Sequence, residues 1–318
     1  NVVLSTLVVH FISSNKESSS MNKENGVSIP ATVTSESAVE IVDFTKTVNA
    51  SFTCMKTKTL LNYFRSYVCV YPSEKDVYVS NSFKQDASIW EEEGVVRIMQ
   101  MLVRYPHLDF IDIGANIGTY TMFAAAMGRS VIAVECFGPN IDRLRRAVQL
   151  ADVANRVVLV QNAIYKESGK YLRLSNVRTN VGGQELDVAG QPDTNHTIFY
   201  NKTSPSDPFI VKTIRFDDLV PIFIARNIRG AILKVDIEGS ESFVFEGGSQ
   251  VFDLLDIPII QIEWVKVRDF PDRANILVDF LAKRNYEPKT FQCQLLYFNQ
   301  TSTWPDDFCW TKKNVTFC

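Results

Sequence analysis

Short apolar runs alternate with helical patterns from residue 108 onward, and this alternation constrains the fold more than any other feature of the sequence. The runs that read as buried strands are 108–114, 130–136, 157–163, 231–239 and 258–264. The helical patterns cover 117–127, the segment after Pro139, the segment around Phe243 and Val251, and 274–285. Continuous apolar strands that alternate with helices are typical of a parallel sheet with helices on both faces. We therefore expect an α/β fold with a mostly parallel, doubly wound sheet.

Weaker patterns add elements on either side of this core. Residues 67–71 and 76–80 alternate apolar and polar side chains around a turn, which predicts a hairpin. A helix is expected at 88–104, with an apolar face made of Val95, Ile98, Met99, Leu102 and Val103. Three more short strands are expected, at 171–175, 209–216 and 294–299. The polar stretch 176–208 reads as an exposed excursion.

The chain is expected to form one main domain with smaller segments at its ends. Of its 318 residues, 46% are hydrophobic, which suffices for a sizeable core. We expect an N-terminal stem or remnant of a targeting segment at 1–37, a small region with the hairpin at 38–85, the main α/β domain at 86–300, and a Cys-containing tail at 301–318. The net charge of −3 excludes a strong overall attraction to nucleic acid.

The N-terminal sequence suggests targeting to the secretory pathway. Residues 2–12 are mostly apolar but too few to span a bilayer, which takes roughly 20 residues. We interpret them as the end of a signal peptide or membrane anchor whose start precedes this chain, followed by a polar stem. A short strand or a frayed apolar end is the alternative.

Cysteines and glycosylation sequons indicate the same compartment. The six cysteines include no CxxC pair, which argues against a zinc site of that kind. All except Cys136, for which we expect a free packed thiol, lie near the ends of the chain and are expected to form disulfides of open connectivity. Five sequons begin at Asn49, Asn195, Asn201, Asn299 and Asn314. We expect a glycoprotein of the secretory lumen, in the Golgi and anchored as a type II membrane protein. The alternative is a cytosolic protein with unused sequons.

The first strand of the core ends in a glycine-containing turn that follows an acid. The residues are Asp112, Gly114, Ala115, Asn116 and Gly118. A nicotinamide fingerprint would place a glycine at position 116, and a carboxylate aimed into the turn would repel a pyrophosphate. A cationic nucleoside avoids both objections, because Asp112 would attract its positive charge. The turn therefore favours S-adenosylmethionine, which carries an ammonium and a sulfonium.

Polar or small residues also end the next two strands. Glu135 ends the second strand, and its two oxygens suit both hydroxyls of a ribose. Asn162 and Ala163 end the third, where an amide can read an adenine edge and a small side chain leaves room for the ring. Each signal alone is weak, because glycine turns are often packing turns and strand-end acids are often solvated. Three such ends in strand order indicate a site for an adenosine nucleoside.

Charged side chains interrupt the fourth strand. Lys234, Asp236 and Glu238 alternate with apolar residues in a strand expected to be buried on both faces, and Glu263 closes the fifth strand. Burying unpaired charges costs several kcal/mol, so these groups must pair or face a cleft. One interpretation is a structural ion pair of Lys234 with Asp236 or Glu263. The other is the floor of a site that faces a methyl donor.

Five segments resemble the FkbM family of methyltransferases. They are DASIWE (86–91), FIDIGANIGTYT (110–121), AVECFGPN (133–140), QNAI (161–164) and ILKVDIEGSE (232–241). The resemblance covers about 88–300 and implies a methyltransferase domain that uses S-adenosylmethionine for O-methylation, often of sugar hydroxyls in glycans. The fold it implies is the Rossmann-like class I methyltransferase sheet, mostly parallel, with an antiparallel strand near the C-terminus.

The resemblance also implies roles for the residues already named. Those of the first turn, from Asp112 to Gly118, would line the methionine end of the donor. Glu135 would hold the ribose, and Asn162 with Ala163 the adenine. Asp236 and Glu238 would lie near the reacting centre.

Transfer of a methyl group to a hydroxyl oxygen needs alignment and is helped by a base. None of the three histidines, His10, His107 and His196, ends a strand. We therefore expect the base to be Asp236 or Glu238, with Glu263 in reserve and Lys234 as the other candidate, and we expect no bound metal. The acceptor is expected to be a glycan or another hydroxyl-bearing molecule. A nicotinamide-dependent oxidoreductase and a non-catalytic nucleoside-binding adaptor are the alternative functions.

Overall fold

The computed structural model describes residues 37–48, 51–84, 88–175, 180–187, 199–200, 207–313 and 315. The compact unit begins at Ala38. The predictions for the stem and the targeting segment lie outside the described residues, as do four of the five sequons and Cys318. Within the described ranges, no helix combines the length and apolar character that a bilayer crossing requires.

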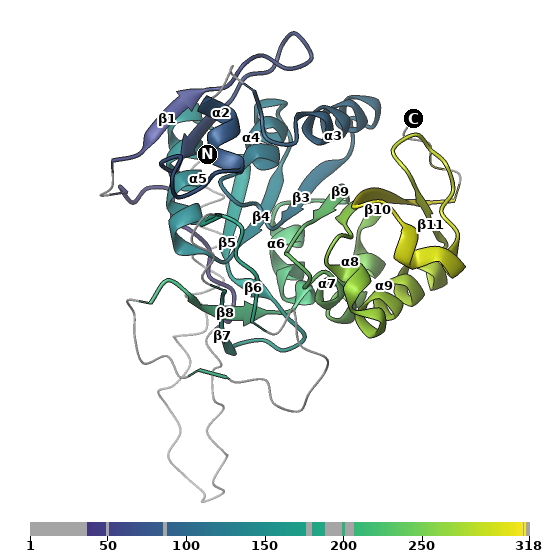
Figure 1. The fold of residues 1–318 in the computed structure, drawn as a ribbon. Helices are drawn as coiled ribbons and strands as arrows, with labels where there is room; N and C mark the ends of the chain where they lie inside the picture. The colour runs from purple at the N-terminus through teal and green to yellow at the C-terminus, as the bar shows by residue number, and fades with distance from the viewer. Residues whose placement is uncertain are drawn as a thin grey trace, which may run out of the picture. The chain divides into compact units, whose positions relative to one another are not determined.

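A seven-stranded sheet forms the centre of the described structure (Figure 1). Its strand order is β11-β12-β10-β9-β3-β4-β5. The strands are β3 (Asp109–Ile113), β4 (Val131–Glu135), β5 (Val157–Gln161), β9 (Gly230–Val235), β10 (Asp256–Glu263), β11 (Tyr286–Lys289) and β12 (Asp307–Lys312). Only β12 runs antiparallel to its neighbours, β10 and β11. The expected sheet, mostly parallel with one antiparallel strand near the C-terminus, is confirmed.

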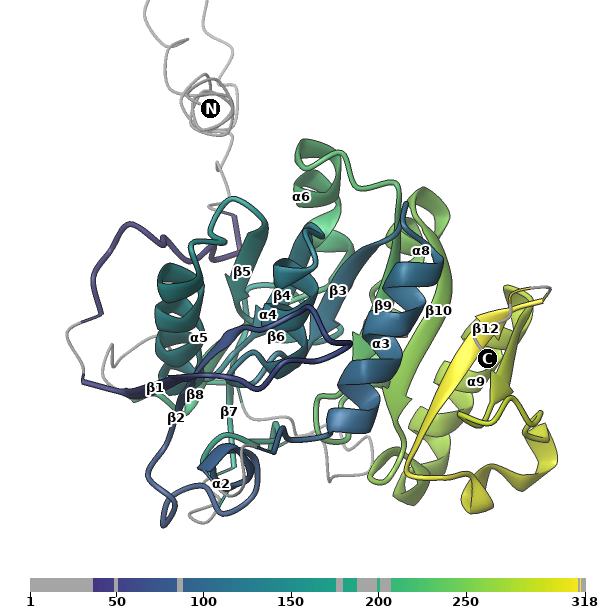
Figure 2. The ribbon, with the colours of Figure 1, turned by 90° about the horizontal axis from the view of Figure 1, so that it is seen from above.

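Helices cover both faces of this sheet (Figures 1 and 2). One face carries α3 (Glu92–Arg104), α4 (Thr119–Ala126) and α5 (Gly138–Ala151), and the other carries α6 (Val220–Ala225), α7 (Ser242–Glu246), α8 (Ser249–Leu254) and α9 (Pro271–Lys283). Side chains alternate between the two cores along each strand: Phe110 packs on the first face and Ile111 on the second. This alternation explains why the strands read as continuous apolar runs.

The apolar face predicted for the helix at 88–104 is correct in four of its five residues. Val95, Ile98, Met99 and Leu102 are buried in α3, whereas Val103 is 57% exposed. Met101 is buried in its place. Successive helical residues are 100° apart, so the buried stripe of α3 is centred away from Val103.

The predicted hairpin at 67–80 is wrong in its second strand. Residues Tyr67–Val70 form β2, but their antiparallel partner is β1 (Thr53–Lys56), and a disulfide joins Cys54 to Cys69. The segment after residue 76 becomes helix α2 (Val79–Lys84) instead. The cause is Asp76, whose carboxylate accepts hydrogen bonds from the backbone N–H groups of Val79 and Ser80, at 3.1 and 2.9 Å. Such a cap starts a helix where the apolar alternation alone suggests a strand.

The 176–208 stretch is not simply an exposed excursion. Its described part, 180–187, packs onto the molecule, with Gly182 and Leu186 buried. A β-bridge pairs Leu186 of this segment with Leu174, which directly follows strand β7 (Tyr171–Arg173). Strand β7 belongs to a small sheet with β6 (Ala163–Ile164) and β8 (Ile210–Ile214). The prediction of an exposed segment is therefore wrong for residues 180–186, whereas Asp187 is exposed.

The last strand lies later in the chain than predicted. Leu295, Tyr297 and Phe298 are exposed, and the 3-10 helix η3 (Phe298–Thr303) begins within the predicted strand. The strand that completes the sheet is β12, where Phe308 and Trp310 are buried against Trp264 and Trp304. The main domain therefore continues beyond residue 300, to at least Lys312.

Cysteine states partly match the sequence analysis. Cys136 is a free thiol as predicted, and Cys293 is disulfide-bonded. Cys309, which we expected to form a disulfide, is free and fully buried in β12. Cys309 lies within the sheet, on a strand paired on both sides by β10 and β11, and its side chain is packed in the core rather than at the periphery.

Candidate active site

A cavity of about 320 Å³ lies where β3, β4 and β9 end. It is lined by ten of the twelve predicted site residues: Gly114, Ala115, Asn116, Glu135, Asn162, Ala163, Lys234, Asp236, Glu238 and Glu263. The two that do not line it are Asp112 and Gly118. Ligand sites of open parallel sheets lie at the carboxyl ends of the strands, so this is the expected place for a binding site.

The turn after β3 requires glycine at position 114. Gly114 has φ +85°, and a Cβ there would lie 1.8 Å from the carbonyl oxygen of Asp236. The backbone N–H groups of Gly114 and Ala115 both donate to the carbonyl of Val134, at 2.9 and 3.0 Å. The glycine therefore lets the loop after β9 come directly against the turn, which closes one side of the cavity.

Gly118 has a packing role rather than a place in the cavity. It caps the N-terminus of α4 at φ +95°, and a Cβ would lie 2.2 Å from the Leu144 side chain of α5. The two glycines of the motif thus serve different needs, because Gly114 shapes the cavity and Gly118 allows two helices to approach.

Glu135 ends β4 with its carboxylate held by backbone groups. Its Oε2 accepts a hydrogen bond from the N–H of Asn116 and its Oε1 accepts one from the N–H of Phe137, both at 2.8 Å. Burial raises the pKa of this carboxyl to about 7, although those backbone donors oppose the shift. The Asn140 side chain and the backbone of Cys136 also hydrogen-bond to it, so a ribose hydroxyl would share or replace one of the about four lone-pair positions that a carboxylate offers. The geometry fits the ribose role expected from the sequence.

Asn162 does not present its amide to the cavity. The amide nitrogen donates to the carbonyls of Ala38 and Lys212, at 3.1 and 3.2 Å, and the amide oxygen accepts from the N–H of Glu40 at 2.8 Å. The side chain is therefore occupied in fixing the 38–40 segment, and the predicted reading of an adenine edge by this amide does not fit. The apolar side chains of Ala163, Ile164 and Leu174 line the cavity here instead.

Lys234 is buried at the centre of the site and has carboxylate partners. Its ammonium lies 2.9 Å from Asp236 Oδ2, 3.9 Å from Asp112 Oδ1, and 4.9 Å from the centre of the Tyr120 ring. Burial alone would lower the pKa of this ammonium, but the surrounding carboxylates, Asp236 first, raise it above its usual range. Of the two interpretations of the charged strand, the Lys234–Asp236 ion pair is present, and Asp236 also lines the cavity.

Asp112 supports Lys234 from beneath the cavity. It is fully buried on β3, directly opposite Lys234 in the strand register, and its Oδ2 accepts from the Thr121 hydroxyl at 2.6 Å. The sequence analysis expected this carboxylate to be aimed into the turn and to attract the donor directly. The structure turns it toward α4 and Lys234, because residue 112 points to the face of the sheet that α4 covers.

Strand β9 ends at Val235, so Asp236 and Glu238 belong to the loop that follows rather than to a strand face. The N–H of Asp236 donates to the carbonyl of Ile113 at 3.0 Å, and Glu238 adopts φ +58°. The Glu238 carboxylate pairs with Lys266 at 2.7 Å. Both acids line the cavity, but each already has a cationic partner: Lys234 for Asp236 and Lys266 for Glu238.

Glu263, at the end of β10, is a poor base at neutral pH. Burial and the nearby carboxylates, Asp236 foremost, raise the pKa of Glu263 to about 10. Its Oε2 is buried and has no hydrogen-bond partner in the described part of the chain. The group therefore carries a proton in the resting protein and suits donation of a hydrogen bond.

Sequence reasoning missed two parts of the cavity wall. One is formed by Tyr78, which directly precedes α2, and by Trp90 and Glu91, which directly precede α3. The other is the 180–187 segment, held over the site by a hydrogen bond from the Asn140 amide to the carbonyl of Gly182, at 2.8 Å. The Gly182–Gly183 pair was a usable signal, since a Cβ at Gly182 would lie 2.9 Å from Asn116 Oδ1. Trp90 and Glu91 belong to the DASIWE segment (86–91) that resembles the FkbM family, but that resemblance gave them no role in the site.

The donor set of the cavity fits S-adenosylmethionine. Glu135 is placed for ribose hydroxyls, small residues line the turn, and the carboxyl group of Asp236 in the cavity wall would favour a cationic sulfur. No group of three or more His, Cys, Asp or Glu side chains within the described residues is arranged to hold a metal ion.

Comparisons with known proteins give one matching family and two similar solved structures. A family model described as "Methyltransferase FkbM domain" matches residues 112–288, more than half of the chain. No curated protein matches the sequence significantly. Two solved structures are similar to this chain: an O-methyltransferase from Bacillus cereus in complex with SAH (14% identity, 70% of this chain, 81% of that chain, TM-score 0.37) and a precorrin-6y C5,15-methyltransferase from Geobacter metallireducens GS-15 (13%, 68%, 85%, 0.32).

Proposed function

This chain belongs to the FkbM family of S-adenosylmethionine-dependent methyltransferases, and we propose that its acceptor is a sugar hydroxyl of a glycan or glycoconjugate in the secretory pathway. The observation that carries the proposal is the composition of the cavity. Carboxylates from the ends of β4, β9 and β10 meet the aromatic side chains of Tyr78 and Trp90 in one space.

A sugar ring suits such a wall. Carboxylates accept hydrogen bonds from hydroxyl groups, and aromatic rings cover the apolar patches that a sugar ring also has. Tyr78 and Trp90 lie edge to face with their ring centres 6.3 Å apart, and both line the cavity. The cavity wall is therefore both polar and aromatic, as a site for a sugar acceptor would be.

The roles of the donor pocket follow from the contacts already described. Glu135 would hold the ribose, and Ala163 with Ile164 and Leu174 would cover the adenine. The turn from Gly114 to Asn116 would hold the methionine part. The bound donor supplies a methyl group on a positively charged sulfur. The protein's contribution is to fix the acceptor oxygen in line with that methyl group and to exclude water.

The secretory location rests on independent features. The disulfide between Cys54 and Cys69 and the bonded state of Cys293 suit an oxidising compartment. Asn299, the one sequon asparagine among the described residues, is exposed on η3, where a glycan chain would have room. When both proteins are expressed through a secretory host, the Asn299→Gln variant should be lighter than the wild type by the mass of one glycan. Equal masses, apart from the substitution itself, would argue against this part of the proposal.

A labelled-donor panel tests the activity. Purified protein is incubated with methyl-labelled S-adenosylmethionine and with neutral glycans, acidic glycans, lipids, peptides and small phenols. We expect label on a glycan, removed by glycosidase digestion, and none with Gly114→Val, in which the new side chain would collide with the backbone of Asp236. Label on peptides or phenols alone would contradict the sugar acceptor, and donor binding without any transfer would favour the adaptor alternative.

A further inference from the structure

We propose that Glu91 is the general base that takes the proton of the acceptor hydroxyl. Glu91 is not among the catalytic residues that we predicted from the sequence. The inference rests on the proposed function in one respect, because it takes the acceptor atom to be a hydroxyl oxygen. It identifies a further catalytic residue in the same cavity.

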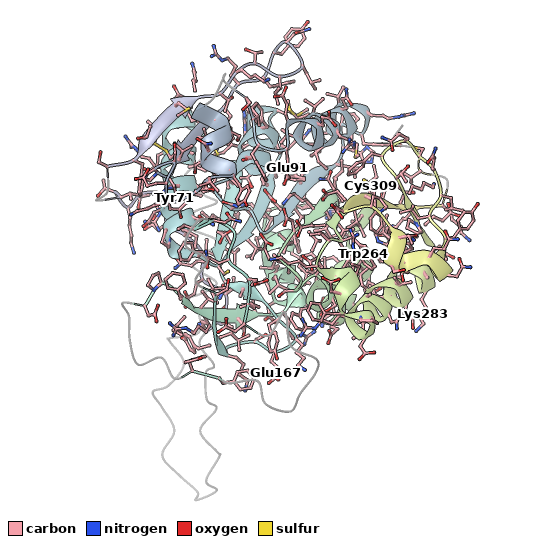
Figure 3. All side chains as sticks on the ribbon, viewed as in Figure 1. Tyr71, Glu91, Glu167, Trp264, Lys283 and Cys309 are labelled. Atoms are coloured by element: carbon pink, nitrogen blue, oxygen red, sulfur yellow. A yellow bond between two sulfur atoms is a disulfide. The ribbon has the colours of Figure 1, made fainter. Side chains whose placement is uncertain are left out.

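Glu91 reaches the cavity from the segment that leads into α3. The residue as a whole is exposed and lines the cavity beside Trp90, so an acceptor can approach it, while its carboxyl group is the part that lies against the buried Tyr120. Figure 3 labels it near the centre of the view, away from the outer surface residues Glu167 and Lys283. The Tyr120 hydroxyl donates to Glu91 Oε2 at 2.9 Å, and the Trp90 side chain is also within hydrogen-bonding reach. These neutral donors orient the carboxylate and leave other lone pairs for an incoming hydroxyl.

The backbone at Glu91 is strained in a way that points to function. Its φ of +52° and ψ of +38° are left-handed, which is uncommon for a residue other than Gly, Asn or Asp. Two other cavity residues share this feature, Asn116 at φ +52° and Glu238 at φ +58°. Strain of this kind costs of order 1–3 kcal/mol and tends to cluster at active sites, and three of the nine described non-glycine residues with positive φ line this cavity.

The other acids of the cavity are committed elsewhere. Asp236 is paired with the buried Lys234, and its protonation would leave that ammonium with Asp112 at 3.9 Å. Glu238 is paired with Lys266, Glu263 already carries a proton at neutral pH, and Glu135 is held by two backbone N–H groups. Two of the described cavity carboxylates, Glu135 and Glu91, are held only by neutral donors, and of these Glu91 is the one that lies beside the aromatic side chain of Trp90.

Its surroundings also suit a base. Burial of the carboxyl group and the nearby Asp236 raise the pKa of Glu91 above its usual value, while Lys234 limits the rise. A base whose pKa lies closer to the working pH takes a proton more effectively. Tyr120 stays protonated, because burial raises the pKa of its hydroxyl, so it continues to donate to Glu91.

The step balances without a further reactant. As the acceptor O–H bond breaks, its proton passes to the Glu91 carboxylate and the oxygen forms a bond to the methyl carbon. The methyl–sulfur bond breaks with its electron pair left on sulfur, which gives the methyl ether and neutral S-adenosylhomocysteine. The Glu91 carboxyl then returns its proton to solvent, to which the residue is open.

Three variants separate catalysis from structure. Glu91→Gln keeps the shape, and we expect kcat to fall by about 10²- to 10⁴-fold, the usual contribution of a general base. Glu91→Gly accepts a positive φ freely, so we expect an unchanged or higher melting temperature with the same loss of kcat, partly restored by added formate. The matched control is Glu93→Gln, an exposed acid two residues away on α3, which should behave as the wild type.

The readouts distinguish this proposal from the proposed function. Calorimetry should show wild-type affinity for S-adenosylhomocysteine in all three variants, and the fall of kcat at low pH should disappear in Glu91→Gln. The assignment of Glu91 as the base would be wrong if Glu91→Gln kept the wild-type kcat on a hydroxyl acceptor. It would also be wrong if Glu91→Gly had both a lower melting temperature and a weaker affinity for S-adenosylhomocysteine. Labelling of amines or thiols alone by the wild type would overturn the proposed hydroxyl chemistry and the base with it.

Discussion

At the scale of single residues, environment separates three glutamates of one cavity. Backbone N–H groups hold Glu135, the Lys266 ammonium holds Glu238, and other carboxylates surround Glu263. Glu135 is therefore suited to holding a ribose, Glu238 to joining two segments through Lys266, and Glu263 to donating a hydrogen bond. Residue type alone could not assign these roles, because they depend on neighbours distant in the sequence.

Glu135→Gln should weaken donor binding while leaving the fold intact. The amide offers a single acceptor oxygen, so it cannot serve the N–H groups of Asn116 and Phe137 and a ribose as well. Losing a hydrogen bond to a charged group costs about 1.5–3 kcal/mol, or roughly 10- to 100-fold in Kd. Calorimetric titration with S-adenosylhomocysteine measures this directly.

Asp112→Asn provides the contrast. Because Asp112 lies beneath the cavity and supports Lys234, we expect a lower melting temperature with S-adenosylhomocysteine affinity changed by no more than a few-fold. If Asp112→Asn abolished binding and Glu135→Gln did not, the assignment of the two carboxylates would be reversed.

At the scale of elements, the parts that the sequence predicted well are those whose pattern is local. Strands β3, β4, β5, β9 and β10 are apolar runs with flanking turns, and each lies where its pattern placed it. The hairpin failed because Asp76 caps α2, and β12 was missed because Asp307–Lys312 becomes a strand only by pairing with β10 and β11. Asn162 was misjudged for a similar reason, since its partner Glu40 is 122 residues away.

The 180–187 segment is the element whose position bears most on the acceptor. Lys266 joins Glu185 of this segment to Glu238 of the loop after β9, at 2.9 and 2.7 Å. These ion pairs are more than one-third exposed at the lysine, so each contributes little to global stability. Their effect should be local, on how firmly the segment covers the cavity.

Lys266→Met should therefore raise the acceptor KM several-fold and change the melting temperature little. It should also speed proteolytic cleavage within 180–187, because the segment would open more often. The control is Lys283→Met, which removes an exposed ion pair with Asp279 on α9; neither residue lines the cavity, and Figure 3 labels Lys283 at the edge of the view, away from Glu91. Equal KM values for the two variants would show that the Lys266 ion pairs do not position the segment.

At the scale of the whole molecule, both ends of the described chain complete the sheet. The N-terminal segment lies along the edge strand β5, where the N–H of Gln161 donates to the carbonyl of Glu40 at 2.7 Å, and the C-terminal strand β12 inserts between β10 and β11. The pairing of β12 with β10 sets Asp307 opposite Glu263, whose pKa is raised by burial and by nearby carboxylates. Stability should consequently depend on pH.

Melting temperature should fall as the pH rises from about 5 to about 8. Burial raises the pKa of Glu135 and Glu241 from an ordinary 4.5 to about 7, and that of Glu263 to about 10. A raised carboxyl pKa means that the folded state binds the proton more tightly than the unfolded state. The stability that Glu135 and Glu241 contribute is therefore complete below pH 4.5 and is lost as the pH passes about 7, and the contribution of Glu263 continues to fall until about pH 10.

Glu241→Gln should flatten this dependence. Glu241 is fully buried, and its Oε1 accepts from the N–H groups of Ile237 and Gly239, which an amide oxygen can replace. Calorimetric scans at several pH values would measure the slope for both proteins. A melting temperature that rises over this range, or equal slopes in the two proteins, would contradict the account.

The most direct measurement is a crystal structure of the protein with S-adenosylhomocysteine bound. The account predicts the ligand in the cavity at the ends of β3, β4 and β9, with its ribose hydroxyls on Glu135 and its sulfur facing the side where Asp236 and Glu91 lie. A ligand bound outside this cavity, or bound in it with Glu135 still engaged only by Asn116 and Phe137, would contradict the assignment of the donor site.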